Sequence, residues 1–498
     1  MPSKGETAVY TDTRLKLTFD AAPVLGARGI INIYKQSDDT LIDTIDLATR
    51  HPNAQLATRL VSVDAIGKNV QPLNNSRMRF VFYTPIKIDG NTATIIPHTG
   101  VLLPDTAYYV TIDAAAFTGK IGGANFAGIN KASGWSFTTK SAPTGATVTV
   151  DDDGAADFRT VQGAINYMMH TGSSSGCAPA CPNAAVDKTI NIKNGTYDEM
   201  LLMRNLNKLT INGESRAGVV VQNANFDSLN PGVGGTAATA NAGVATGNAG
   251  GGRALLLIEG GDEMVFNNFT MRNLHVKAAN LGNQAEVFYF NGQTLTGSRL
   301  SAKFMNIYST QDTINTKGWV WFYKSTVSGD VDFIWGSPWA ALFEESEIRT
   351  VVDTTLASSG GYVVQSRAQF GFPGFVFLNS TLTAEAGIPA GATYLARNGG
   401  SGCDATAKSC DNIAYINTKM GPHIAPAGWS GTPNPAVASD DAGWREYAST
   451  DANGAALDIS KRAATSIQVS PGGYTTKFNT RAKVFSQFNN NAGWNPQP

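Results

Sequence analysis

The feature that most constrains the fold of this chain is a short repeat in its second half. An aromatic residue is followed five positions later by an aliphatic residue, and an asparagine recurs at the third position of the units. Strand-sized repeats with irregular insertions are typical of solenoids and favour a parallel β-helix, with a large β-sandwich as the alternative. We expect the aromatics and asparagines to point inward and to stack from coil to coil. The pairs are Phe266–Met271, Phe322–Val327, Phe343–Ile348, Phe377–Leu382 and Tyr415–Met420, and the asparagines are Asn268, Asn306, Asn379 and Asn417.

The first 140 residues follow another pattern. Apolar and polar residues alternate in short runs, as in Leu15–Phe19 and Tyr108–Ile112, which predicts an antiparallel β-sandwich. The segments Leu-Leu-Pro-Asp-Thr-Ala-Tyr-Tyr-Val and Trp-Ser-Phe-Thr-Thr resemble those of bacterial immunoglobulin-like domains. A chain of 498 residues exceeds the size of a single core. We therefore predict an immunoglobulin-like accessory domain at 1–140, acting as a spacer or a binding module, a linker at 141–146 and a β-helix at 147–498.

Charge and cysteine content restrict the partners and the compartment. The 38 basic and 39 acidic side chains create no overall field that would favour nucleic acid or a membrane surface, and no apolar run is long enough for a membrane span. The close pairs Cys177/Cys181 and Cys403/Cys410 predict disulfides in an oxidising compartment. We predict no metal site, and we interpret Asp151–Asp153 as a solvated turn rather than a calcium site.

The segment from Gln284 to Gly336 contains the residues that suggest chemistry. Asp312 and Asp332 are two carboxylates, and Gln284 and Gln311 are two amides, in a region of short strands. On a β-helix, outward residues of successive coils collect on one face, so these positions become neighbours. One carboxylate could attack an ester carbonyl while the other, as an acid, protonates the departing alkoxide and the amides stabilise the oxyanion. Arg397, on a later coil, could orient the attacking carboxylate.

Residues 147–498 resemble the pectin methylesterases, or carbohydrate esterase family 8. The resemblance implies a right-handed parallel β-helix without a metal or organic cofactor. It implies that Asp332 is the nucleophile, Asp312 the acid and then the base, Gln284 and Gln311 the oxyanion-hole amides, and Arg397 the residue that orients Asp332. The matching segments are Val148–Gly154, Asp157–Ile165, Ile190–Glu199, Gln284-Ala285, Gln311–Thr313, Asp332–Gly336, Leu395–Arg397, Pro426–Trp429 and Gly493-Trp494.

The same resemblance predicts the substrate and the setting. The substrate would be methyl-esterified homogalacturonan in pectin, and the products methanol and de-esterified pectate. Such a substrate, together with paired cysteines, predicts an enzyme that is secreted or periplasmic, although this numbering begins without a signal peptide. We expect a monomer.

Some positions depart from the family pattern. The family arginine is followed by proline and tryptophan, whereas Asn398 and Gly399 follow Arg397. Another aromatic would then have to stack on the sugar, although strand aromatics are also common in cores. The loop 223–252, rich in small residues, would form a rim or lid. The predicted substrate-binding residues are Trp335, Trp319, Glu286 and Asp330.

Three other functions compete with this interpretation. Ser174, in Gly172-Ser-Ser-Ser-Gly176, has the spacing of a serine esterase, but it follows a predicted helix rather than a strand. A non-catalytic polysaccharide-binding β-helix would keep the surface without turnover. A thioesterase-like relative would keep the acyl chemistry and change the substrate.

Overall fold

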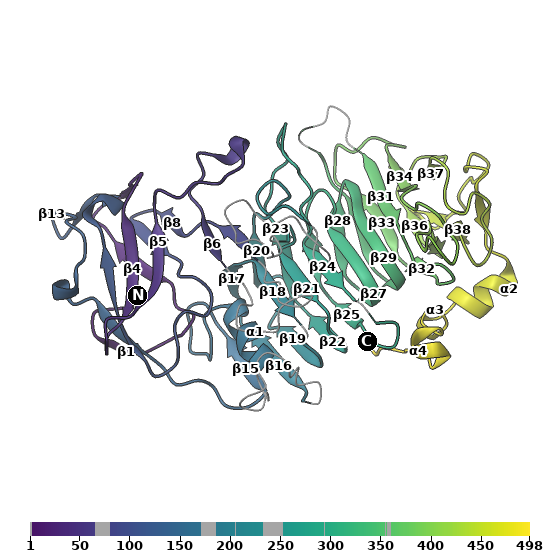
Figure 1. The fold of residues 1–498 in the computed structure, drawn as a ribbon. Helices are drawn as coiled ribbons and strands as arrows, with labels where there is room; N and C mark the ends of the chain where they lie inside the picture. Colours follow the sequence, from purple (N-terminus) through teal and green to yellow (C-terminus); the bar gives the residue numbers. More distant parts are fainter. Residues whose placement is uncertain are drawn as a thin grey trace.

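The computed structural model describes residues 2–64, 80–170, 186–204, 206–232, 252–292, 294–353, 355 and 360–498. A β-sheet unit formed by the N-terminal residues lies at one end of the molecule, and a long stack of strands extends from it to the other end (Figure 1). The predicted pair Cys177/Cys181 and Ser174 lie outside the described residues, as does most of the predicted rim loop. No helix in the described ranges is long and apolar enough to cross a membrane.

The stack consists of parallel strands in two sheets, as expected for a β-helix. The long strands β27 (Ile314–Tyr323) and β29 (Val331–Glu344) run through two rows of the larger sheet. The other strands of this sheet are β15 (Thr147–Val150), β16 (Lys188–Ile192), β18 (Leu201–Arg204), β19 (Leu209–Gly213), β21 (Leu256–Glu259), β22 (Met264–Asn267), β24 (Phe288–Asn291), β25 (Arg299–Lys303), β31 (Gly361–Ser366), β32 (Gly374–Leu378), β34 (Thr393–Arg397), β35 (Ile413–Ile416), β37 (Trp429–Ser430), β38 (Trp444–Tyr447) and β40 (Ser466–Gln468).

The smaller sheet closes each coil on the remaining side. Its strands carry the aliphatic residues of the repeat, such as Val327 and Ile348, which are buried in the same core as the repeat aromatics. In order, they are β17 (Gly195–Asp198), β20 (Val219–Asn223), β23 (Thr270–Asn273), β26 (Asn306–Tyr308), β28 (Thr326–Gly329), β30 (Glu347–Thr350), β33 (Thr381–Ala384), β36 (Lys419–Met420) and β39 (Thr450–Asp451). The helix α1 (Val161–His170) packs beside the first coils.

The predicted aromatic ladder is confirmed. Phe322, Phe343, Phe377 and Tyr415 stack inside the β-helix with ring centroids 4.6, 4.9 and 4.4 Å apart in successive pairs. All four side chains are fully buried. Each ring covers the next because parallel strands in register place equivalent residues one coil apart.

The prediction that the asparagines form an inward ladder was wrong. Asn268, Asn379 and Asn417 adopt left-handed backbone conformations at turns, with φ of 64°, 53° and 51°, and they are partly or fully exposed. Asparagine favours this conformation because its short side chain tolerates positive φ. The equivalent position of the coil containing Asn306 is Phe304, with φ of 54°, so that unit was aligned two residues out of register.

Serines replace the asparagines as the inward polar ladder. The backbone N–H groups of Met305, Ser325 and Ser346 donate to the hydroxyls of Ser325, Ser346 and Ser380, respectively, at 3.1–3.2 Å. The three serines are almost fully buried. Each hydroxyl therefore satisfies a turn amide of the neighbouring coil that would otherwise be left unpaired.

The N-terminal unit has one core between two main sheets. Residues from both sheets, including Leu15, Ile33, Ile95 and Phe137, form one buried cluster. This arrangement agrees with a β-sandwich, whereas the immunoglobulin-like character of residues 1–140 stays a prediction. The five-stranded sheet is β1 (Glu6–Val9), β14 (Ser136–Thr139), β10 (Ala107–Ile112), β4 (Ile30–Lys35) and β5 (Leu41–Asp46), and the three-stranded sheet is β2 (Leu15–Thr18), β9 (Thr92–Ile95) and β8 (Ile86–Asp89). Short pairs complete the unit: β3 (Val24–Leu25) with β11 (Phe117–Thr118), β12 (Lys120–Ile121) with β13 (Ala124–Asn125), and β6 (Ser62–Asp64) with β7 (Val81–Tyr83).

This N-terminal unit packs directly on the β-helix. Val61 and Phe82 share a buried cluster with Phe226, Leu229 and Ala285 from the β-helix side. Among the described residues, a second mixed cluster of this kind joins Val81 to Leu202, Ala254, Leu257 and Tyr289. The unit is therefore joined to the β-helix by an apolar interface, which a freely hinged spacer would lack.

Short C-terminal helices cover one side of the stack. Trp319, predicted to bind substrate, is fully buried here against Phe485 and Phe488, so it offers no face to a sugar and this prediction was wrong. The elements are α2 (Pro471–Gly473), a π-helical turn Tyr474–Phe478, α3 (Arg481–Val484) and α4 (Phe488–Asn491).

Candidate active site

The strand register brings the predicted catalytic residues together. Ile314 of β27 pairs with Ile334 of β29, so Asp312 and Asp332, two residues before each, lie on adjacent coils. The backbone N–H of Asp312 donates to the carbonyl of Val331 at 3.1 Å. On the preceding coil the N–H of Ala285 donates to the carbonyl of Gln311, also at 3.1 Å, which places Gln284 beside Gln311.

Asp332 is paired with Arg397, as predicted. The Arg397 Nε–H donates to Asp332 Oδ1 at 2.8 Å, and its NH2 group donates to Oδ2. Gln365, on the coil between them, donates from Nε2 to Oδ2 at 3.3 Å. Such two-pronged contact fixes the orientation of a carboxylate as well as its position. Asp332 is 5% exposed, and the Arg397 side chain is 40% exposed, so the pair reaches the surface on the arginine side.

Asp330, two residues earlier, lies in a separate environment. Its carboxylate is fully buried and accepts a hydrogen bond from Lys277 Nζ at 2.6 Å, and Lys277 also binds Asp353 at 2.8 Å. The predicted role of Asp330 in substrate binding was therefore wrong, because a sealed ion cluster cannot reach a polymer. The two acids diverge because Asp332 has φ of 49° and the ladder is irregular between Val331 and Ile334, which breaks the alternation of an ideal strand.

Asp312 is surrounded by a charge cluster that the sequence did not reveal. Arg253 donates from Nη2 to Asp312 at 3.1 Å, from Nε to Glu286 at 2.9 Å, and from Nη1 to Asp227 at 2.9 Å. Glu286 was predicted to bind substrate, but it is fully buried behind Arg253, so that role was wrong. The available signal was Glu286 itself, since a carboxylate in a core position requires a buried cation.

These surroundings favour the acid form of Asp312. Burial raises the pKa of the Asp312 carboxyl well above its usual value, and the negative charge of Glu286 raises this pKa further. Arg253 acts in the opposite direction on the same pKa, and Asp332 adds a smaller upward contribution. A carboxyl kept protonated by burial and by neighbouring acids is suited to donate a proton.

Other side chains complete the local surface. Within the described part of the chain, the side-chain amides of Gln284 and Gln311 are partly exposed and donate to no other residue. The guanidinium groups of Arg253 and Arg367 lie 5.8 and 5.3 Å from the ring of Trp335, which is 9% exposed. It belongs to the site but presents little surface for stacking.

Tyr362 is an aromatic of this surface that sequence reasoning missed. It is partly exposed, it stacks on Tyr394 with centroids 5.8 Å apart, and the Arg397 guanidinium lies 5.1 Å from its ring. The ladder pairing of Tyr362 with Val331 could have been found only from the register of β29 and β31.

The segment after Arg397 explains the missing tryptophan. A Cβ at Gly399 would lie 2.3 Å from Gln365 Cγ, so no larger residue fits there. The N–H groups of Gly399 and Gly400 donate to the buried Asp411 carboxylate at 2.8 and 3.0 Å. A disulfide joins Cys403 to Cys410 and closes this loop, as predicted for the second cysteine pair.

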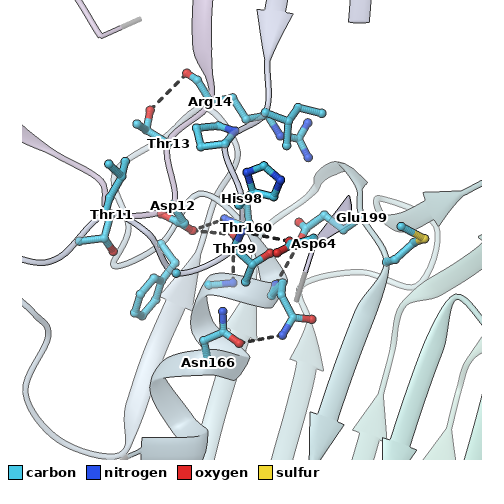
Figure 2. Close-up of a pocket in the computed structure, with 18 of the residues that line it drawn as sticks. Thr11, Asp12, Thr13, Arg14, Asp64, His98, Thr99, Thr160, Asn166 and Glu199 are labelled. Atoms are coloured by element: carbon cyan, nitrogen blue, oxygen red, sulfur yellow. Dashed lines mark hydrogen bonds between the residues drawn. The ribbon is translucent and has the colours of Figure 1, made fainter. Parts of the chain in front are cut away.

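A separate cavity of about 780 Å³ lies between the N-terminal unit and the β-helix (Figure 2). None of the predicted catalytic residues lines it. Two of the acids that line it bind the start of α1: Asp12 accepts hydrogen bonds from the N–H groups of Arg159 and Thr160, and Glu199 accepts them from those of Val161 and Gln162, at 2.7–2.9 Å. Burial raises the pKa of Glu199 to about 6. These contacts satisfy helix N–H groups and are typical of structural capping.

Metal-ligating groups gather at one place among the described residues. The carboxylate oxygens of Asp151, Asp152 and Asp153 lie within 4.8 Å of one another. Asp151 Oδ1 already accepts the N–H groups of Asp153 and Gly154, at 3.2 and 2.9 Å, so the group forms a turn on the exposed surface. This geometry fits the interpretation as a solvated turn.

The similarity of this chain to known proteins lies in its fold. No protein-family model matches the sequence, and no curated protein matches it. The fold is similar to that of the pectin methylesterase PemA from Erwinia chrysanthemi, with a TM-score of 0.51 and 23% identity over 71% of this chain and 99% of that one. It is also similar to a pectin methylesterase solved with a hexasaccharide, with a TM-score of 0.50 and 22% identity over 72% of this chain and 100% of that one. The chain therefore contains a parallel β-helix with the fold of these proteins.

Proposed function

We propose that this protein is a carboxylic ester hydrolase that removes methyl groups from galacturonate units of pectin. One observation carries the proposal: on adjacent coils, Asp332 is held by Arg397 while Asp312 sits in surroundings that favour its acid form. A nucleophilic carboxylate beside a protonated carboxyl is the pair that ester cleavage requires. The similarity to pectin methylesterases supports the choice of substrate.

In the first step, an oxygen of Asp332 attacks the carbonyl carbon of the methyl ester. The side-chain N–H groups of Gln284 and Gln311 stabilise the negative charge that forms on the carbonyl oxygen. As the C–O bond to the methoxy group breaks, Asp312 gives its proton to that oxygen, and methanol leaves. The product is an anhydride between Asp332 and the galacturonate carboxyl group.

In the second step, Asp312 acts as the base. It takes a proton from a water molecule that attacks the galacturonoyl carbonyl, and the anhydride bond breaks to regenerate the Asp332 carboxylate. The galacturonate leaves as a free carboxylic acid, which ionises, and Asp312 is again protonated. Tyr362, beside Arg397, would provide the sugar-stacking face that the family tryptophan provides elsewhere.

The test is methanol release from methyl-esterified polygalacturonate. We expect release by the wild type and none above background from Asp332→Ala, with unchanged thermal unfolding. Ser174→Ala is the matched control and should keep full activity. Loss of activity in Ser174→Ala, with activity kept in Asp332→Ala, would establish a serine esterase instead.

Two further measurements separate the remaining functions. Binding of pectin without methanol release across a broad pH range would identify a polysaccharide-binding β-helix. Faster turnover of acyl thioesters than of pectin would identify a thioesterase. We also propose that the protein works outside the cytoplasm, which the Cys403–Cys410 disulfide supports, and that it is a monomer.

A further inference from the structure

Arg253 is a buried cation that holds three acids at the candidate site. Its side chain is 12% exposed, and its nitrogens contact Glu286, Asp227 and Asp312 within 3.1 Å. Only Asp312 among these has a part in the proposed reaction. Glu286 and Asp227 therefore fix the guanidinium beside the reacting carboxyl and also offset its positive charge.

The backbone on both sides of Arg253 is fixed by one buried amide. Asn225 Nδ2 donates to the carbonyl of Gly252 at 2.9 Å and to that of Ala254 at 2.7 Å. Asn225 is 1% exposed. Together with the side-chain contacts, these two hydrogen bonds from Asn225 leave the Arg253 guanidinium little freedom to move away from Asp312.

Further hydrogen bonds connect Asn225 to the N-terminal unit. Asn230 Nδ2 donates to Asn225 Oδ1 at 2.9 Å and to the carbonyl of Phe82 at 3.0 Å, while the Phe82 N–H donates to Asn230 Oδ1 at 2.7 Å. His51 Nε2 adds a contact of 2.9 Å to the carbonyl of Leu229. The segment 225–230, which carries Asp227, is thus clamped between β7 and Arg253.

We infer that Arg253 is a positioning residue that sets the charge environment of the acid Asp312, and that the N-terminal unit holds it in place through Asn230 and Asn225. This inference rests on the proposed function for its catalytic meaning. When Asp312 gives up its proton, Arg253 stabilises the carboxylate that forms, so it makes Asp312 a stronger acid. Glu286 has the opposite effect on Asp312. The charged groups that face Asp312, directly or through Arg253, are Arg253, Glu286, Asp332, Arg367, Arg397 and Asp227.

The decisive experiment measures the pKa of Asp312 directly. The full chain is labelled with 13Cγ-aspartate, and the Asp312 signal is assigned by its absence in Asp312→Asn. We expect Arg253→Met to raise the Asp312 pKa by at least about one unit and Glu286→Gln to lower it. Arg253→Lys keeps the positive charge and should fall between the wild type and Arg253→Met. Arg299→Met, which removes a cation paired with Asp262 and Glu263 elsewhere on the stack, should leave the Asp312 signal unchanged.

Opposite shifts in Arg253→Met and Glu286→Gln would support the inference, since loss of packing alone would not reverse sign. Equal pKa values for Asp312 in wild type, Arg253→Met and Glu286→Gln would overturn it. Because Glu286→Gln nearly preserves side-chain size, it keeps the test open if Arg253→Met does not fold.

Asn230→Ala tests the contribution of the N-terminal unit. It should shift the Asp312 pKa in the same direction as Arg253→Met, by a smaller amount, and an unchanged Asp312 pKa would overturn this part. Since no substrate is present, these results stand apart from the proposed function, which the methanol assay tests. In an active enzyme, the alkaline limb of kcat/KM should move with the measured Asp312 pKa in each variant.

Discussion

Asp330 and Asp332 lie two residues apart in the chain, Asp330 just before β29 and Asp332 within it, and their surroundings differ. Asp332 contacts the partly exposed Arg397, whereas Asp330 is sealed with Lys277 and Asp353. The local sequence, Gly-Asp-Val-Asp-Phe, gives no reason to prefer either acid. The difference teaches that a backbone irregularity of one residue decides which carboxylate faces a substrate and which becomes part of the core.

The largest expected effect separates the two acids by chemistry. Asp332→Asn should lower kcat by at least about three decades, because an amide is a poor nucleophile. Asp330→Asn should change kcat less than about tenfold, because its contacts are to Lys277 and not to the reacting groups. Methanol release at saturating substrate measures both, and an inactive, folded Asp330→Asn would break the comparison.

The next effect concerns stability. Lys277→Met leaves Asp330 and Asp353 facing each other without their cation, and breaking such a buried cluster costs about 3–5 kcal/mol. Denaturant unfolding should show this loss. Lys193→Met, at an exposed pair with Glu214, is the control and should leave the unfolding midpoint close to that of the wild type. Equal losses in the two variants would show that the Asp330 cluster is not a structural element.

A third test addresses the role of the partly exposed Gln311 amide. Gln311→Ala removes one proposed oxyanion donor next to Asp312 and should lower kcat by about two to three decades with little change in KM. The unfolding midpoint should stay near that of the wild type, because the Gln311 amide is partly exposed. A rise in KM with unchanged kcat would instead assign Gln311 to ground-state binding.

The smallest expected effect is the pH dependence of the buried cluster. Burial raises the pKa of Asp330 to about 6, above its ordinary value of 3.8, so the folded state binds this proton more tightly than the unfolded chain does. Stability from this group is complete below pH 3.8 and decreases as the pH rises through 6. Asn cannot titrate, so wild type should lose at least about 1 kcal/mol relative to Asp330→Asn between pH 4 and pH 7. Parallel stability curves for the two proteins would contradict this sign.

Some of this structure could be predicted from the sequence because it depends on repetition. The recurring aromatics predicted the ladder from Phe322 to Tyr415, since residues at the same place in each coil must meet when the strands are parallel. The same reasoning brought Asp312 next to Asp332, whereas the contact of Arg397 with Asp332, two coils away, was implied by the family resemblance. Alternating residues predicted the N-terminal sheets.

Other features could not be predicted because they depend on segments far apart in the chain. Trp319 was predicted to stack on a sugar, but in the structure a C-terminal segment more than 150 positions later in the chain covers it. Glu286 was predicted to bind substrate, but Arg253, which follows the insertion of small residues, covers it in the structure. The N-terminal unit looked like a spacer, yet Phe82 contacts Asn230 and so supports the segment beside the site.

The sequence by itself therefore determined the coil, its aromatic core and the placement of Asp312 beside Asp332, because a regular repeat places equivalent residues one strand spacing apart. Only the tertiary structure decided which charged groups are buried, which cations contact several acids and which charged groups reach the surface. The physical reason is that the repeat acts between neighbouring coils, whereas burial and charge depend on whatever distant segment covers them.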